Sequence, residues 1–213
     1  MSTSAKSKKR SKGVIALLLI DVVNHFEFPD GDRILRQALL IGHNIARLKA
    51  RARTAGIPTN YVNDNFGDWR SERSVLLDHC LQPEAKGKEV VKLVRPDEQD
   101  YFILKPMHSA FYQTPLEVLL QKLGTTELIL TGLRSNSCIT CTAHDANMRN
   151  LKLFVPYDCS VARTAIEHRK AMQHLSTMTK ANVVTSHNLR LGKSLKKVWI
   201  TRDKLRTTGK RVL

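Results

Sequence analysis

Three side chains that together can carry out nucleophilic catalysis follow apolar segments of this sequence. Asp21 comes directly after the run IALLLI, and Lys105 ends the segment YFILK. Cys138 lies a short distance beyond Gly132, which follows the segment LILT. A carboxylate, an amine and a thiol are thus each placed close to the end of a segment that is suited to a buried strand.

These groups favour covalent catalysis in which Cys138 is the nucleophile. An unperturbed thiol has a pKa near 8.5 and is mostly protonated at neutral pH, although the thiolate is the reactive form. In the first turn of a helix, free backbone N–H groups and the helix dipole stabilise the thiolate, and Lys105 would add a positive charge. Asp21 would take the thiol proton and later return it to a leaving amine. The backbone N–H groups of the turn 132–138 are available for a developing oxyanion.

The segments around these residues alternate short β-rich runs with longer helical patterns, which predicts a parallel sheet with crossover helices. Apolar residues at helical spacing and capping residues predict helices over 34–52, 115–123, 137–149 and 164–179. The expected strands are 14–21, 58–63, 101–105, 128–131, 151–155 and 182–185. Several of these are continuously apolar, as expected when helices cover both faces of a sheet. We therefore predict an α/β domain of the three-layer, Rossmann-like, doubly wound class, with a mostly parallel six-stranded sheet.

Ligands of such sheets bind in the crevice outside the carboxyl ends of the strands. Asp21, Lys105 and Cys138 are all predicted to lie at this edge. Residues that closely follow strand ends would line the same crevice, and the candidates for substrate binding are His25, Phe26, Asn63, Asp64, Asn65 and Phe111. For the three that follow the second strand, an Asx-rich turn is an equal alternative.

The stretch TGLRSNSCITCTAHDANMRN, residues 131–150, resembles the nucleophile segment of the isochorismatase-like cysteine hydrolases. This superfamily includes nicotinamidases and N-carbamoylsarcosine amidohydrolase. The stretch contains the family's glycine turn, its Ser-x-x-Cys and its helix with T-A-x-D-A. ALLLIDVVNHF is similar to the family strand that ends in the catalytic aspartate, and LKPMHSAF is similar to its lysine segment. The resemblance covers residues 13–186 with the motifs in the family's order.

The resemblance implies a catalytic triad of Asp21, Lys105 and Cys138. It also implies a cis peptide bond between Leu133 and Arg134 in the nucleophile turn, which helps to aim the oxyanion donors. Arg134 is larger than the residue usual at this place, so it narrows the pocket or favours an anionic substrate.

The chain also departs from the family pattern in a way that bears on metal binding. Nicotinamidases bind a metal through an Asp-x-His pair and another histidine after the second strand, whereas here Asp64 is followed two positions later by Phe66. We therefore expect neither a metal nor another cofactor. Isochorismatases generally lack the cysteine, so the presence of Cys138 favours acyl or amide chemistry.

The resulting prediction is a metal-independent cysteine hydrolase that acts on a small amide, carbamoyl or related acyl substrate through a thioester on Cys138. A vinyl-ether hydrolase is the alternative within the superfamily. Two alternatives come from other classes. One is a thiol oxidoreductase that uses Cys138 and Cys141 as a C-x-x-C pair, and the other is a nucleic-acid binder that uses basic tails.

The net charge of +16 is concentrated at the two ends of the chain. Residues 1–12 carry five Lys/Arg and no acidic residue, and residues 190–213 carry nine Lys/Arg and one aspartate. The body, 13–189, has 21 basic and 18 acidic residues and is nearly neutral. We predict a hydrolase domain over 13–189 between a disordered basic tail and a basic C-terminal extension. The two ends would bind polyanions non-specifically.

The remaining expectations concern compartment and assembly. The longest apolar run, 14–20, is far shorter than the roughly 20 residues that span a membrane. No small-residue cleavage site follows it, which argues against a signal peptide. Four cysteines are too few for a disulfide scaffold in a chain of 213 residues. We expect a cytoplasmic enzyme with a small-molecule substrate and no membrane partner, assembled as a homo-oligomer, either a dimer or a tetramer.

Overall fold

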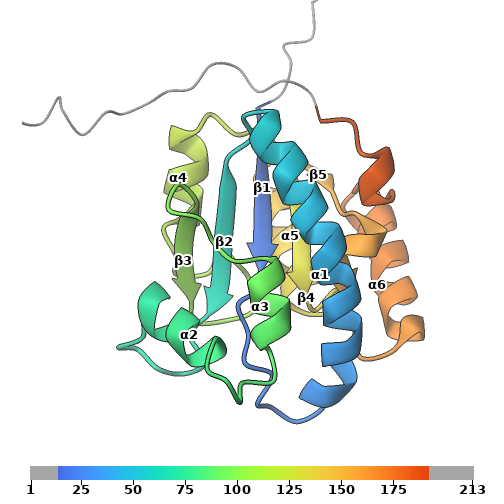
Figure 1. Cartoon of the computed structure of the whole chain (residues 1–213). Coiled ribbons are helices and arrows are strands. Elements are labelled where there is room, and N and C mark those ends of the chain that lie inside the picture. Colours follow the sequence, from blue (N-terminus) through green and yellow to red (C-terminus); the bar gives the residue numbers. More distant parts are fainter. Residues whose placement is uncertain (1–13, 192–213) are drawn as a thin grey trace, which may run out of the picture.

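The computed structural model describes residues 14–191, and the two basic ends, 1–13 and 192–213, lie outside the described part. A six-stranded parallel sheet forms the centre of the fold, with the strand order β3-β2-β1-β4-β5 and with β6 paired to β4 (Figure 1). The strands are β1 Ile15–Ile20, β2 Thr59–Asp64, β3 Tyr101–Lys105, β4 Glu127–Leu133, β5 Lys152–Phe154 and β6 Ser160–Val161. The predicted fold class is confirmed.

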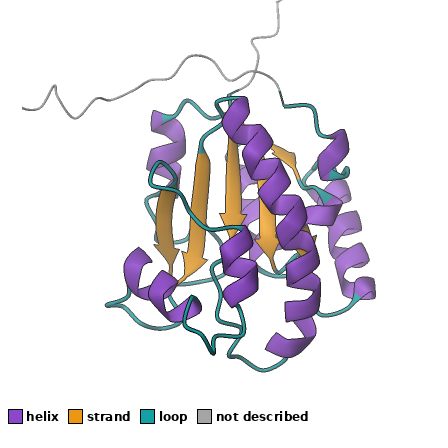
Figure 2. Cartoon of the chain, in the orientation of Figure 1, coloured by secondary structure: helices purple, strands orange, loops and turns teal. Residues whose placement is uncertain are grey.

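Helices cover both faces of this sheet (Figure 2). They are α1 Gly31–Thr54, α2 Arg73–Cys80, α3 Lys88–Leu93, α4 Leu116–Lys122, α5 Cys138–Met148 and α6 Ala165–Met178, with 3₁₀ turns η1 Tyr157–Cys159 and η2 Ser186–Asn188. The alternation of side chains along β1 explains the two cores. Leu17 and Leu19 pack with α1, α2 and α3, whereas Leu18 and Ile20 pack with α4, α5 and α6. No helix in the described range is long and apolar enough to cross a membrane.

The structure corrects the sequence-based assignment in two places. The expected strand 182–185 is reduced to one isolated bridge between Asn182 and Phe154, and the sixth strand is instead the two-residue β6. Helices α2 and α3 were not predicted, because each is short and buries only a few apolar side chains in its own length.

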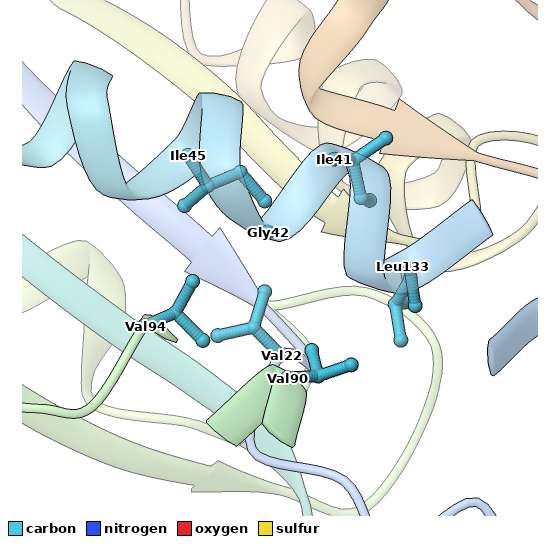
Figure 3. Close-up of a pocket in the computed structure, with 8 residues that line it drawn as sticks. Val22, Ile41, Gly42, Ile45, Val90, Val94 and Leu133 are labelled. Carbon is cyan, nitrogen blue, oxygen red and sulfur yellow. The ribbon is translucent and has the colours of Figure 1, made fainter. Parts of the chain in front are cut away.

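A small apolar cavity of about 10 Å³ lies between α1 and the residues packed against it (Figure 3). Its lining consists of Val22, Ala38, Ile41, Gly42, Ile45, Val90, Val94 and Leu133. A space of this size is at most large enough for one water molecule and offers no polar partner, so it is a packing defect and no substrate pocket.

We expect Gly42→Ala to stabilise the fold by about 0.5–1 kcal/mol, which corresponds to an increase in Tm of roughly 1–4 °C. Gly42 lies inside α1, where alanine has the higher helix propensity, and its new Cβ would lie 3.3 Å from the flexible Cδ1 of Leu93. Gly31→Ala in the same helix is the matched control, because its Cβ would collide with the backbone oxygen of Phe26 and should lower Tm. Thermal unfolding of both variants tests this, and a lower Tm for Gly42→Ala would contradict it.

Candidate active site

Three strand ends bring together a buried amine and two carboxylates. Lys105 at the end of β3 is fully buried, and its Nζ lies 3.1 Å from Oδ2 of Asp21 and 3.3 Å from Oδ2 of Asp64. Nζ also donates to the backbone oxygen of Met107 at 3.1 Å. The backbone N–H of Asp64 donates to Oδ1 of Asp21 at 2.7 Å. The strand register produces this arrangement, because Asp64 is paired with Lys105 and Asp21 directly follows β1.

The thiol of Cys138 lies against the same amine. Its Sγ is 3.6 Å from Nζ of Lys105, the amine that pairs with the carboxyl of Asp21. Cys138 is the first residue of α5 and is 8% exposed. The structure therefore brings together the three side chains that the sequence predicts to be catalytic.

Burial and the neighbouring charges together shift the pKa values of Asp21, Lys105 and Cys138. Burial raises the pKa of Asp21 above its ordinary value of 3.8, and the lowering effect of Lys105 does not cancel it. Burial would lower the pKa of Lys105, but the carboxylates of Asp21 and Asp64, together with Cys138 once its thiol is ionised, outweigh it and raise this pKa above 10.5. For Cys138, burial and the charge of Asp21 raise the pKa to about 12, although Lys105 lowers it. At neutral pH the free site therefore has a protonated thiol, and a base must remove its proton during the reaction.

The turn that precedes Cys138 presents unpaired backbone donors. The peptide bond between Leu133 and Arg134 is cis. The backbone N–H groups of Ser137 and Ile139 both donate to the oxygen of Arg134. Within residues 14–191, the N–H groups of Arg134, Asn136 and Cys138 donate to no protein acceptor. The N–H of Cys138 lies at the start of α5 beside its own sulfur, and that of Arg134 lies in the turn before it, so both are available to an anionic oxygen.

The turn also requires a glycine. Gly132 has a φ of 114°, and a Cβ at this position would collide with the backbone oxygen of Ile20. Gly132 is paired with Ile20 in the sheet, so β4 can approach the end of β1 closely at this point.

Of the six predicted substrate-binding residues, three make their contacts within the fold and three lie closer to groups that can contact a ligand. Phe26 is 1% exposed and packs in the core on the α1 face, and Asn63 is fully buried and hydrogen-bonds both backbone groups of Val23. Asn65 accepts from the N–H of Gly67, as the alternative Asx-turn interpretation expects. These three side chains therefore hold the fold and its loops together, because their contacts are with the chain itself.

The other three lie closer to groups that can contact a ligand. Asp64 pairs with Lys105, and the ring of half-buried His25 lies 4.5 Å from the ring of Phe66. Phe111 belongs to the same apolar cluster as Cys138, and the guanidinium of Arg149 lies 4.7 Å from its ring.

Sequence reasoning did not assign His108 to the site. Its Nδ1 lies 3.9 Å from Sγ of Cys138, and its side chain is exposed. His108 follows Lys105 by three residues in an irregular loop, and no periodic pattern predicts the direction of a loop side chain. Its position next to the lysine segment is the only signal the sequence contains.

The nicotinamidase type of metal site does not fit these residues. Asp64 Oδ1 accepts from the N–H of Phe66, and its Oδ2 pairs with Lys105. Phe66, at the position where the family pattern has a histidine, provides no ligand atom.

A different group of metal-ligating side chains lies near Phe66. In the described part of the chain, His25, Glu27 and His79 place ligand atoms within 4.8 Å of one another. Oε2 of Glu27 lies 3.3 Å from Nε2 of His79, and the N–H of Glu27 donates to Nδ1 of His25 at 2.9 Å. Because Nδ1 of His25 already accepts a backbone hydrogen bond and the other two residues are exposed, we assign no metal to this cluster.

Comparison with known proteins agrees with the motifs and the geometry. The family model described as the isochorismatase domain matches residues 15–188. The isochorismatase family protein YaaI of Bacillus subtilis is 32% identical over 179 residues, which cover 84% of this chain and 98% of YaaI. Ureidoacrylate amidohydrolase RutB of Methylobacterium radiotolerans is 29% identical and covers 76% of this chain and 72% of RutB.

A solved structure of an amidase is also similar to this chain. N-carbamoylsarcosine amidase from Thermoplasma acidophilum is similar to this chain with a TM-score of 0.64 and 26% identity, over 83% of this chain and 98% of the amidase. The resemblance inferred from the motifs is confirmed: the chain belongs to the isochorismatase family of hydrolases.

Proposed function

We propose that this protein is a cysteine hydrolase that cleaves a small amide, carbamoyl or related acyl compound through a thioester on Cys138, without a metal. One observation carries the proposal: the thiol of Cys138, the carboxyl of Asp21 and the ammonium of Lys105 meet in one buried contact. A vinyl-ether hydrolase would have no use for this thiol. Two relatives, RutB and the Thermoplasma amidase, are named for amide and carbamoyl substrates, which supports the same class for this chain.

The reaction begins with attack on the substrate carbonyl. Asp21 takes the thiol proton while the sulfur bonds to the carbonyl carbon, and Lys105 stabilises the negative charge on the sulfur and the carboxylate. The carbonyl oxygen becomes negative and accepts hydrogen bonds from the free N–H groups of Arg134 and Cys138.

Collapse of this intermediate breaks the C–N bond. Asp21 gives its proton to the departing nitrogen, which leaves as an amine or ammonia, and the acyl group remains on Cys138 as a thioester. Asp21 then takes a proton from a water molecule that attacks the thioester carbon. The C–S bond breaks, the acid is released, and the proton returns to the thiol. One water is consumed for each amide bond cleaved.

The residues around the sulfur of Cys138 determine which substrates can reach it. His108 contacts Sγ from an exposed loop, so it lines the path by which a substrate reaches the thiol. Arg134 is half-buried beside the unpaired donors, where its charge favours a substrate with an acidic group.

Trapping of the acyl-enzyme tests the proposal. The protein is mixed with a panel of small amides, carbamoyl compounds and ureides, quenched in acid and weighed by intact-mass spectrometry, and the adduct is then located by peptide mapping. We expect a mass increase equal to the acyl group, located on Cys138. Hydrolysis without any adduct on Cys138, or hydrolysis that persists in Cys138→Ala, would contradict the thioester mechanism.

We also expect hydrolysis to survive exhaustive treatment with a chelator. The reason is that Asp64 is engaged by Lys105 and that Phe66 provides no ligand atom. Activity before and after EDTA dialysis, with and without added zinc or iron, measures this. Loss of activity on chelation, with recovery when a metal is added, would overturn the prediction. If the added metal then failed to restore activity in His79→Ala, the ion would be located at His25, Glu27 and His79.

A further inference from the structure

We infer that Ser135 and His168 act as one positioning unit, which holds the nucleophile turn so that the N–H groups of Arg134 and Cys138 face the reacting oxygen. The inference rests on the proposed function, because it assigns these N–H groups to the oxyanion. Ser135 lies inside the turn, and His168 comes from α6, far along the chain. Nδ1 of His168 lies 3.0 Å from Oγ of Ser135, and its Nε2 lies 3.0 Å from the backbone oxygen of Tyr157.

These contacts determine the proton positions on His168. The oxygen of Tyr157 can only accept a hydrogen bond, so Nε2 carries the hydrogen. Burial lowers the pKa of His168, although the Tyr157 oxygen raises it, and the ring is therefore neutral at pH 7. In the neutral ring Nδ1 is an acceptor, and the hydroxyl of Ser135 must donate to it. The hydroxyl is thereby held in one direction by a ring whose other nitrogen is tied to η1.

The backbone of Ser135 is held as firmly as its side chain. Its N–H donates to the oxygen of Val161 in β6 at 2.8 Å, and its oxygen accepts from Oγ1 of Thr140 in α5 at 2.6 Å. Ser135 is fully buried, and His168 is 8% exposed. The turn is therefore attached to α6, β6 and α5 at a single residue, and that residue directly follows Arg134.

The attachment of Ser135 matters for the reaction because it holds the neighbouring backbone N–H groups that have no acceptor in the described part of the protein. The N–H groups of Ser135, Ser137 and Ile139 all have acceptors within the protein. Those of Arg134, Asn136 and Cys138 have none within residues 14–191, and Arg134 and Cys138 are the two that the proposed function assigns to the oxyanion. Oxyanion donors are effective only when their direction is fixed before the reaction, and loss of one such donor lowers kcat by roughly 10²–10³-fold. A turn that shifts by part of an ångström should lose part of this effect.

The test uses Ser135→Ala, His168→Phe and the double variant. Phenylalanine keeps a ring against Tyr157 but removes both nitrogens. We expect each single variant to lower kcat by about 10–100-fold with KM within threefold. The double variant should lose little more than the worse single variant, because the two residues act as one unit. Ser135→Thr, which keeps the hydroxyl, should retain most of the activity.

Two measurements separate positioning from a general loss of stability. Tyr61→Phe removes another buried hydroxyl, which donates to the oxygen of Val94 at 2.6 Å on the α1 face of the sheet, and it should lower Tm without lowering kcat. The second is the rate at which iodoacetamide alkylates Cys138, measured by peptide mass spectrometry. Alkylation at a saturated carbon forms no oxyanion, so Ser135→Ala and His168→Phe should leave this rate within about twofold.

The outcomes are distinct. If the wild type forms no acyl-enzyme on Cys138, the proposed function fails and the inference fails with it. If the wild type hydrolyses amides through Cys138 but Ser135→Ala and His168→Phe keep wild-type kcat, only the inference is wrong. Equal losses of kcat and alkylation rate, or additive losses in the double variant, would also overturn it, since they indicate that the two residues merely support the fold.

Discussion

Cys138→Ala should lower amide hydrolysis on the order of 10⁴–10⁶-fold, because within residues 14–191 Cys138 is the thiol that contacts Lys105 and no other free cysteine contacts this amine. The change should affect folding only slightly, since the alanine keeps the Cβ and the start of α5. Steady-state hydrolysis, intact-mass trapping and thermal unfolding of the same preparation measure the three effects. A variant that folds but neither hydrolyses nor forms an adduct is the expected result.

Cys141→Ala is the matched control for this prediction. Cys141 lies one turn further along α5, is half-buried, and is a free thiol like Cys138. Its replacement should leave hydrolysis within about threefold. If both substitutions abolished activity equally, the C-x-x-C oxidoreductase alternative would replace the hydrolase, because a redox pair requires both sulfurs.

Asp21→Asn should change hydrolysis and thiol reactivity in opposite directions. Hydrolysis should fall by about 10²–10⁴-fold, since asparagine cannot take the thiol proton. The pKa of Cys138, which burial and the charge of Asp21 raise to about 12, should fall, because Lys105 then lowers it unopposed by Asp21. Alkylation of Cys138 by iodoacetamide, followed against pH, should therefore reach half its maximum at a lower pH than in the wild type.

Asp64→Asn is the control for the thiol measurement. Asp64 also pairs with Lys105, but the pKa of Cys138 is set by burial, Asp21, Lys105 and Ser137. Its replacement should leave the pH dependence of alkylation nearly unchanged. An equal shift in both variants would show that net charge, rather than the contact of Asp21 with the thiol, controls Cys138.

The acid limit of hydrolysis follows from the same carboxyl. Asp21 acts as a base only when ionised, and burial raises its pKa above 3.8. Activity should therefore decline as the pH falls through this raised pKa, at a higher pH than an exposed aspartate would give. A pH profile of kcat/KM for the wild type shows this limit.

The strands and the reacting groups could be predicted because both depend on local patterns. A run such as IALLLI can only be buried on both faces, and the residue that follows such a strand must lie at the carboxyl edge. Asp21 was located in this way, and Lys105 was located as the last residue of the segment YFILK. The helix that begins with Cys138 needed only the glycine turn and the apolar positions of the segment that follows it.

The residues that were missed depend on contacts between distant segments. Nothing near His168 indicates that its ring meets Ser135, which lies in another crossover. Phe26 was expected in the crevice, but the chain has a positive φ of 61° at this residue, and its ring packs in the core. The pairing of β6 with β4 involves two residues per strand, too few for any periodic pattern.

The register of the sheet places the reacting groups, whereas the residues that would contact a substrate lie on the connecting segments. Pairing of Asp64 with Lys105, and of Gly132 with Ile20, places the reacting groups, and a slip of one residue would turn the affected side chains to the opposite face. His25, Phe66 and His108, by contrast, lie on connecting segments outside the strands. Changes in length and composition of these segments can therefore alter the preferred substrate while the register is retained. Grafting the connections of an amidase of known specificity onto this sheet is accordingly a direct route to redesigning its selectivity.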